Sequence, residues 1–160
     1  MIRQVKISDA ESICSIYNEY VERTTVTFEE EPVSADEMGS RIKHITQHFP
    51  WLVYEDQGNV LGYTYASRWK ERSAYRYSVE TAIYVDSNYV GMDIGTKLTR
   101  ALLEELRALS IHSVNAGITL PNPASIALYE KFGFEKIAHF KEVGFKFNKW
   151  IDVGYWELVI

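Results

Sequence analysis

Residues 79–109 read VETAIYVDSNYVGMDIGTKLTRALLEELRAL and carry the strongest fold signal in the chain. The β-branched and aromatic residues at 79–85 predict a buried strand. Apolar residues then recur at helical spacing over 94–109, which predicts an amphipathic helix; they are Ile94, Leu98, Ala101, Leu102, Leu106 and Leu109. A short polar loop with Gly91 and Gly95 lies between the two segments. Because such a unit presents backbone N–H groups and a helix dipole to an anion, we predict a pyrophosphate-binding site at this loop.

The size and composition of the chain predict one soluble domain that spans residues 1–160. Hydrophobic residues make up 46% of the chain and charged residues 24%, as is typical of globular proteins. No segment reads as a membrane span or as a secretory signal. Cys14 is the single cysteine, which rules out an internal disulfide and favours a cytoplasmic protein with a buried, unreactive thiol. A net charge of −5 without a basic stripe argues against a nucleic-acid partner.

The flanking segments add further helices and strands. The serine patterns Ser8–Glu11 and Ser34–Glu37 predict capping boxes at the starts of two helices. Another helix is expected to begin with Asn122 as cap and Pro123 in its first turn, and to stop at Gly133. Strands are expected at 2–6, 51–54, 60–69, 76–85, 113–119, 135–143 and 150–159. This order predicts an α/β (α+β) fold, with about four helices flanking a mixed, mostly antiparallel sheet of about seven strands.

Two segments carry candidate chemistry. On a helix that starts at Asn122, Ser125 and Tyr129 project along the same side, and Tyr129 could donate a proton to a leaving group. Alternatively, Asn122 is only a cap and Tyr129 only an edge of the core. Glu80 stands inside an apolar strand, so its carboxylate lies either on a solvated face or in a cavity that raises its pKa. The residues alone favour the solvated face.

Two loops remain open to interpretation. Residues 23–32, RTTVTFEEEP, form either the wall of a binding site around Phe28 or a plain connector with Phe28 in the core. The glycine loop VGMDIG at 90–95 matches neither the dinucleotide fingerprint nor the nucleoside-triphosphate loop. Spacing takes the functional prediction no further.

Several longer motifs, in order, resemble a known family. They are IYNEY at 16–20, FEEEPV at 28–33, LGYTYA at 61–66, YRYSVETAIYV at 75–85, NPASIALYEKFGF at 122–134 and VGFKFNKWIDV at 143–153. Together they resemble the GNAT superfamily of N-acetyltransferases, and within it the phosphinothricin and methionine sulfoximine acetyltransferase family. The similarity extends over nearly the whole chain.

The resemblance implies transfer of an acetyl group from acetyl-coenzyme A to the primary amine of a small amino acid or analogue, by direct attack in a ternary complex. It implies that Glu80 deprotonates the amine and that Tyr129 protonates the thiolate. Cofactor contacts are implied at Ile83, Tyr84, Val85, Gly91, Met92, Asp93, Ile94, Gly95, Thr96, Asn122 and Ser125. Substrate contacts are implied at Phe28, Ser73, Ala74, Tyr75 and Arg76, with Arg76 on the carboxylate of the amino acid. A homodimer is also implied, and no metal, nucleic acid or membrane.

The chain departs from the superfamily pattern Arg/Gln-x-x-Gly-x-Gly/Ala at its phosphate loop. Val90 removes a cation or amide, and Asp93 replaces a glycine. A left-handed backbone at Asp93 would cost about 1 kcal/mol, unless Asp93 instead caps the helix with its side chain turned outward. We therefore expect weaker cofactor binding than in a protein with the full motif. Two alternatives are an acetyltransferase for a different amine and a non-catalytic module that binds coenzyme A or an amino acid.

Overall fold

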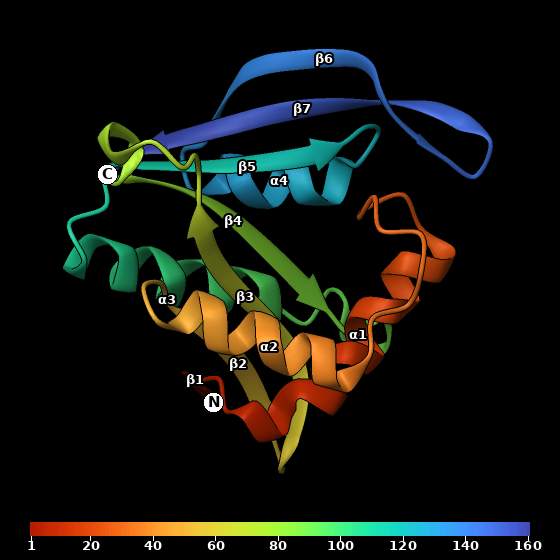
Figure 1. The fold of residues 1–160 in the computed structure, drawn as a ribbon, viewed down its shortest axis with the longest axis vertical. Helices are drawn as coiled ribbons and strands as arrows, with labels where there is room; N and C mark the ends of the chain where they lie inside the picture. Colours follow the sequence, from red (N-terminus) through yellow and green to blue (C-terminus); the bar gives the residue numbers. More distant parts are fainter.

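The computed structural model describes all 160 residues and contains one seven-stranded sheet with helices on both faces (Figure 1). In chain order the strands are β1 (Ile2–Gln4), β2 (Trp51–Asp56), β3 (Asn59–Arg68), β4 (Ser78–Val85), β5 (Ser113–Thr119), β6 (Glu135–Lys146) and β7 (Lys149–Val159). Their spatial order is β1-β2-β3-β4-β5-β7-β6. The helices are α1 (Ala10–Arg23), α2 (Ala35–Thr46), α3 (Ile94–Ala108) and α4 (Pro123–Lys131). The predicted fold class, with its number of strands and helices, is confirmed.

The pairing of β4 with β5 positions the site. This is the one parallel pair in the sheet, and it extends only from Ser78 opposite Ser113 to Glu80 opposite Asn115. On its other edge β4 stays paired with β3 as far as Val85. Figure 1 shows β4 and β5 separating beyond their short contact. The second half of β4 therefore has a backbone edge that no strand of the sheet occupies.

Two hydrophobic cores lie on opposite faces of the sheet. One contains the apolar face of α3, including Leu98, Leu102 and Leu106, together with Tyr129 of α4. The other contains α1 and α2 and is centred on Trp51 of β2. Successive residues of β2 enter different cores, as the alternation of side chains along a strand requires. At the gap between β4 and β5, α4 therefore covers one face of the sheet, and α1 with the segment after it covers the other.

The start of α1 differs from the prediction. Ser8 does not cap this helix; a short 3-10 turn over Ile7–Asp9 precedes it. The carboxylate of Asp9 instead accepts the Lys6 backbone N–H at 2.7 Å and forms an ion pair with Arg3 at 2.8 Å. Asp9 holds the N-cap position of α1, but its side chain makes no capping hydrogen bond to that helix; its charged hydrogen bonds go to the residues before the 3-10 turn.

The other predicted helix ends are confirmed. Ser34 Oγ accepts the Glu37 N–H at 3.1 Å, and Asn122 Oδ1 accepts the Ser125 N–H at 3.2 Å. Gly133 follows α4 with a left-handed φ of +93°. Cys14 is buried, and burial raises the pKa of its thiol, so the prediction of an unreactive side chain agrees with its surroundings.

None of the helices is long and apolar enough to cross a membrane. No three side chains of His, Cys, Asp or Glu gather in an arrangement that would hold a metal ion.

Candidate active site

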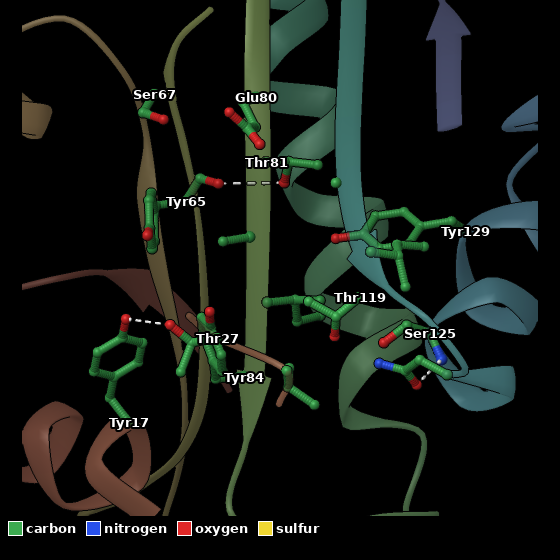
Figure 2. A pocket seen from close by; sticks show the side chains of 16 residues that line it. Tyr17, Thr27, Tyr65, Ser67, Glu80, Thr81, Tyr84, Thr119, Ser125 and Tyr129 are labelled. Carbon is green, nitrogen blue, oxygen red and sulfur yellow. Dashed lines mark hydrogen bonds between the residues drawn. The ribbon is translucent and has the colours of Figure 1, made fainter. Parts of the chain in front are cut away.

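Three adjoining cavities open where β4 and β5 diverge. The central cavity, of about 290 Å³, lies between β4, β5 and α4. Figure 2 shows Glu80 and Tyr84 of β4 on one side of it, and Ser125 and Tyr129 of α4 on the other. Asn122, the cap of α4, also lines it, so the three polar residues that the helical spacing placed in a row share one cavity wall.

A second cavity, of about 550 Å³, lies between the loop before α3 and the start of α4. It adjoins the central cavity through shared residues, among them Ile83 and Ser125. The predicted pyrophosphate loop forms its wall through Gly91, Asp93, Ile94, Gly95 and Thr96, and Val85 lines it as well. Met92 is 59% exposed and lies outside this wall. Because the loop leads into the N-terminus of α3, this second cavity, the phosphate-side cavity, is suited to an anion.

The two departures from the superfamily motif have structural consequences here. Asp93 adopts a left-handed φ of +63°, and its side chain makes no capping hydrogen bond, so the cap interpretation is wrong. Val90 is 63% exposed at the wall and offers no polar group. However, Lys131 at the end of α4 also lines the phosphate-side cavity, with its Nζ 3.4 Å from Thr96 Oγ1. Sequence reasoning missed this cation, because its position depends on how α4 packs beside α3.

The third cavity, of about 640 Å³, lies on the other side of the central one, and we call it the outer cavity. Its walls come from the loop before α2, the end of β3, β6 and β7. Glu80, Tyr84, Thr27 and Thr119 line both the outer and the central cavity. The phosphate-side, central and outer cavities thus form a continuous series. The Glu80 carboxylate lies at the border between the central and the outer cavity.

Glu80 is half-buried in this border position. Burial is the main cause of a raised pKa of its carboxyl group, while the charge of Lys70 and an interaction with Tyr155 act in the opposite direction. A Cβ added at Gly117 of β5 would lie 3.2 Å from Glu80 Oε1. The solvated face that the residues alone favoured is therefore wrong. β5 leaves β4 just after Glu80, and the space it vacates becomes a cavity.

Tyr129 of α4 faces Glu80 across the central cavity. Its side chain is 5% exposed, and its phenol points toward β4 (Figure 2). Burial raises the pKa of the Tyr129 hydroxyl far above neutrality, so it carries its proton at physiological pH. The ring of Phe134 packs on its edge with the centroids 5.0 Å apart. This fixed, protonated phenol is a potential proton donor.

The loop at 24–33 is a wall of the site rather than a plain connector. Phe28 lines the outer cavity and is 39% exposed. The neighbouring Thr27 is held twice: its hydroxyl lies 2.8 Å from Tyr17 Oη, and its carbonyl accepts a hydrogen bond from Lys146 Nζ at 2.8 Å. Lys146 is 1% exposed, and burial lowers the pKa of its ammonium group. The conformation of this wall therefore depends on groups from both α1 and β6.

The segment expected to bind the substrate lies elsewhere. Ser73 and Arg76 line a further pocket of about 460 Å³ at the start of β4, which shares Lys70 with the outer cavity, and Ala74 and Tyr75 are exposed. The Arg76 guanidinium donates a hydrogen bond to the Ser73 carbonyl at 3.1 Å and stacks over Tyr77. The structure does not bring these four residues together with Glu80. Lys70, which sequence reasoning did not single out, lines both this pocket and the outer cavity.

Comparison with known proteins agrees with this geometry. Residues 2–154 match the acetyltransferase (GNAT) domain family. A phosphinothricin N-acetyltransferase of Streptomyces viridochromogenes is 36% identical over 98% of this chain and 85% of its own length. An L-methionine sulfoximine/L-methionine sulfone acetyltransferase of Pseudomonas aeruginosa is 35% identical over 98% of this chain and 92% of its own.

A solved structure shares the fold throughout. The phosphinothricin acetyltransferase of Sinorhizobium meliloti, in complex with acetyl-coenzyme A, superposes with a TM-score of 0.97 at 36% identity, covering 100% of this chain and 88% of its own. The chain therefore belongs to the GNAT family of acetyltransferases, as an acetyl-coenzyme A-dependent N-acyltransferase related to the phosphinothricin and methionine sulfoximine enzymes.

Proposed function

We propose that this enzyme acetylates the α-amine of a small amino acid or analogue by direct attack on acetyl-coenzyme A in a ternary complex. The observation that carries the proposal is the position of Glu80, which borders both the central and the outer cavity. A group there reaches a thioester in one cavity and an amine in the other without moving. The names of the two enzymes compared above support an amino-acid-like acceptor.

The phosphate-side cavity supports binding of the coenzyme. The glycine loop and the first turn of α3 offer backbone N–H groups to the pyrophosphate, and Lys131 supplies the charge that Val90 lacks. The backbone N–H and C=O of Ile83 point to the free edge of β4 and are available to the pantetheine arm, because those of Tyr84 face Tyr63 of β3. The Val85 carbonyl accepts a hydrogen bond from Tyr20 Oη at 2.5 Å, which leaves the Val85 N–H and the backbone groups of Ile83 for this pairing.

The proposed reaction needs one base and one acid. Glu80, directly or through water, takes a proton from the ammonium group; the neutral amine then attacks the thioester carbonyl and a C–N bond forms. As the C–S bond breaks, Tyr129 gives its proton to the departing thiolate. The amide nitrogen then loses its second proton to the Tyr129 phenolate, which restores the acid, and Glu80 releases its proton to solvent. The thioester is already activated, so positioning of the amine and proton transfer are the main contributions of the protein. Lys70 lines the outer cavity and its charge acts on Glu80, so it is the candidate partner of the acceptor's carboxylate.

Thiol release from acetyl-coenzyme A in the presence of a panel of amines tests the proposal. We expect amino acids with a free α-amine to release thiol at a rate well above hydrolysis, and their N-acetylated forms to release none. Initial rates that intersect when both substrates are varied would support a ternary complex. Binding of the coenzyme without thiol release for any amine would instead support a non-catalytic binding module.

Replacing Asp93 with glycine is expected to tighten coenzyme binding. The substitution removes a carboxylate from the phosphate-side cavity and relieves the left-handed strain at φ +63°. Each effect is worth about 1 kcal/mol, so we expect roughly fivefold tighter binding of coenzyme A in calorimetry and a gain in unfolding free energy. Gln57→Gly is the matched control, because Gln57 also has a positive φ, of +48°, in a distant hairpin turn. It should stabilise the fold without changing coenzyme binding, and unchanged or weaker binding by Asp93→Gly would contradict the prediction.

We further propose that the enzyme acts in the cytoplasm as a homodimer. The single, buried thiol supports the location. Exposed aromatic side chains on the β6–β7 hairpin support association, since large apolar side chains gathered on a surface often mark an interface; Phe145, Phe147 and Trp150 are 49–65% exposed. Sedimentation equilibrium tests the second part, and a single species of monomer mass at micromolar concentration would exclude it.

A further inference from the structure

We propose that the acceptor is an amino acid with an apolar side chain, aliphatic or aromatic, rather than one with a charged or strongly polar side-chain group. The inference rests on the proposed function and specifies its substrate class. It is carried by the distribution of polar groups around the outer cavity, which would receive the acceptor.

The polar and apolar walls of this cavity are separated. The end that it shares with the central cavity contains Thr27, Glu80, Tyr84 and Thr119, all with hydroxyl or carboxyl groups. The end that belongs to the outer cavity alone is formed mainly by apolar side chains; among them are Phe28, Trp69, Ile137, Phe140, Val143 and Val153. An amine held at Glu80 therefore directs its side chain toward a hydrophobic surface.

Three aromatic rings give this surface a defined shape. Tyr155 of β7 packs edge-on against Trp69, with the centroids 5.6 Å apart, and against Phe140, with the centroids 5.9 Å apart. Such edge-to-face contacts hold the rings in place and leave apolar surface for a ligand. Side chains that bury hydrocarbon against them gain from the loss of water contact.

The charges present argue against an anionic acceptor side chain. Lys70 is the only cation among the 15 lining residues and Glu80 the only anion. The α-carboxylate of an amino acid requires one cation, so the outer cavity itself holds no second cation for a phosphinate; the next cations, Arg68, Arg72 and Arg76, line the adjoining pocket at the start of β4. Oxygen atoms of a sulfone or sulfoximine would lie against the apolar walls without hydrogen-bond partners, which disfavours them.

Competition among acceptors in the thiol-release assay tests the inference. With acetyl-coenzyme A saturating, we expect kcat/KM for L-phenylalanine, L-leucine or L-methionine to exceed that for phosphinothricin at least tenfold, with L-methionine sulfone between them. A preference for phosphinothricin or the sulfone over all three apolar amino acids overturns it.

A charge-introducing substitution provides the second test. Phe140→Arg places a cation on the apolar wall and should lower kcat/KM for phenylalanine at least fivefold while raising that for phosphinothricin. Val159→Arg is the matched control, because Val159 is an exposed apolar residue at the end of β7, 57% exposed against 50% for Phe140, and it lines none of the three cavities. The control should keep the wild-type order of acceptors, and an unchanged order in both variants contradicts the proposal.

Failure of the proposed function gives a different result. If no amine releases thiol, the proposed function is wrong. The inference about the acceptor is then tested by comparing the dissociation constants of the candidate amino acids. Trp69 at the cavity wall is the basis for that measurement, since quenching of tryptophan fluorescence on titration reports ligand binding there. A Trp69→Phe variant shows how much of the fluorescence quenching comes from Trp69. Tighter binding of phenylalanine than of phosphinothricin supports the inference, and the reverse order excludes it.

Discussion

The Glu80→Gln enzyme should lose roughly 100-fold to 10,000-fold in kcat, the range typical of removing a general base. Glutamine keeps the size of the side chain and its place between the two cavities, but it cannot accept a proton from the ammonium group. Because Glu80 belongs to neither the glycine loop nor the helix starts, coenzyme affinity in calorimetry should stay within about twofold. Near-normal turnover in this variant would show that Glu80 is not the base.

The dependence of kcat/KM on pH is a second test of Glu80 as the base. Burial raises the pKa of Glu80, so in the wild-type enzyme kcat/KM should fall as pH decreases through a value above the usual 4.5. Below that pKa the carboxyl group carries a proton and cannot act as a base. Glu80→Gln should lack this acidic limb and keep only the limb that arises from the amine itself. Glu135→Gln, an exposed carboxylate on β6, is the control and should retain both limbs.

The local parts of the fold were predictable because they depend on neighbouring residues. Helical spacing identified α3, and the Asn122–Pro123 pair identified the start of α4. Local reasoning failed at the start of α1: Ser8 lies in a 3-10 turn instead of capping the helix, and the neighbouring Asp9 is held by Arg3 of β1. Intrinsic preferences are therefore overridden at the points where segments distant in sequence meet.

The site itself was only partly predictable for the same reason. Residue patterns alone placed Glu80 on a solvated face, since nothing in its own strand indicates that β5 diverges just beyond it. The resemblance supplied candidate roles, but the cations Lys70 and Lys131 were found only in the three-dimensional arrangement. Each is one exposed lysine among several in the sequence. Their proximity to the cavities is a property of tertiary packing.

The Gly144→Ala substitution should raise KM for the acceptor about tenfold and change KM for acetyl-coenzyme A little. Gly144 of β6 lies directly beneath Phe28, and a Cβ added there would overlap the phenyl ring. Relieving such overlap costs about 1–3 kcal/mol, and here the ring can escape only by moving into or away from the outer cavity. Either movement changes the wall that contacts the acceptor. Gly39→Ala on α2, whose Cβ would meet Ile7 at an ordinary 3.9 Å, is the control for the added methyl group and should leave both KM values unchanged.

A double-mutant cycle separates this mechanism from general damage to β6. With Phe28→Ala already in place, no ring remains for the new methyl group to displace, so Gly144→Ala should add little further increase in KM. The two effects would then be strongly non-additive, as expected for residues in contact. Independent, multiplying effects on KM would instead show that alanine at 144 disturbs the strand itself. Because Phe28 is 39% exposed, its truncation should cost little unfolding free energy, so the cycle can be measured in enzymes that remain folded.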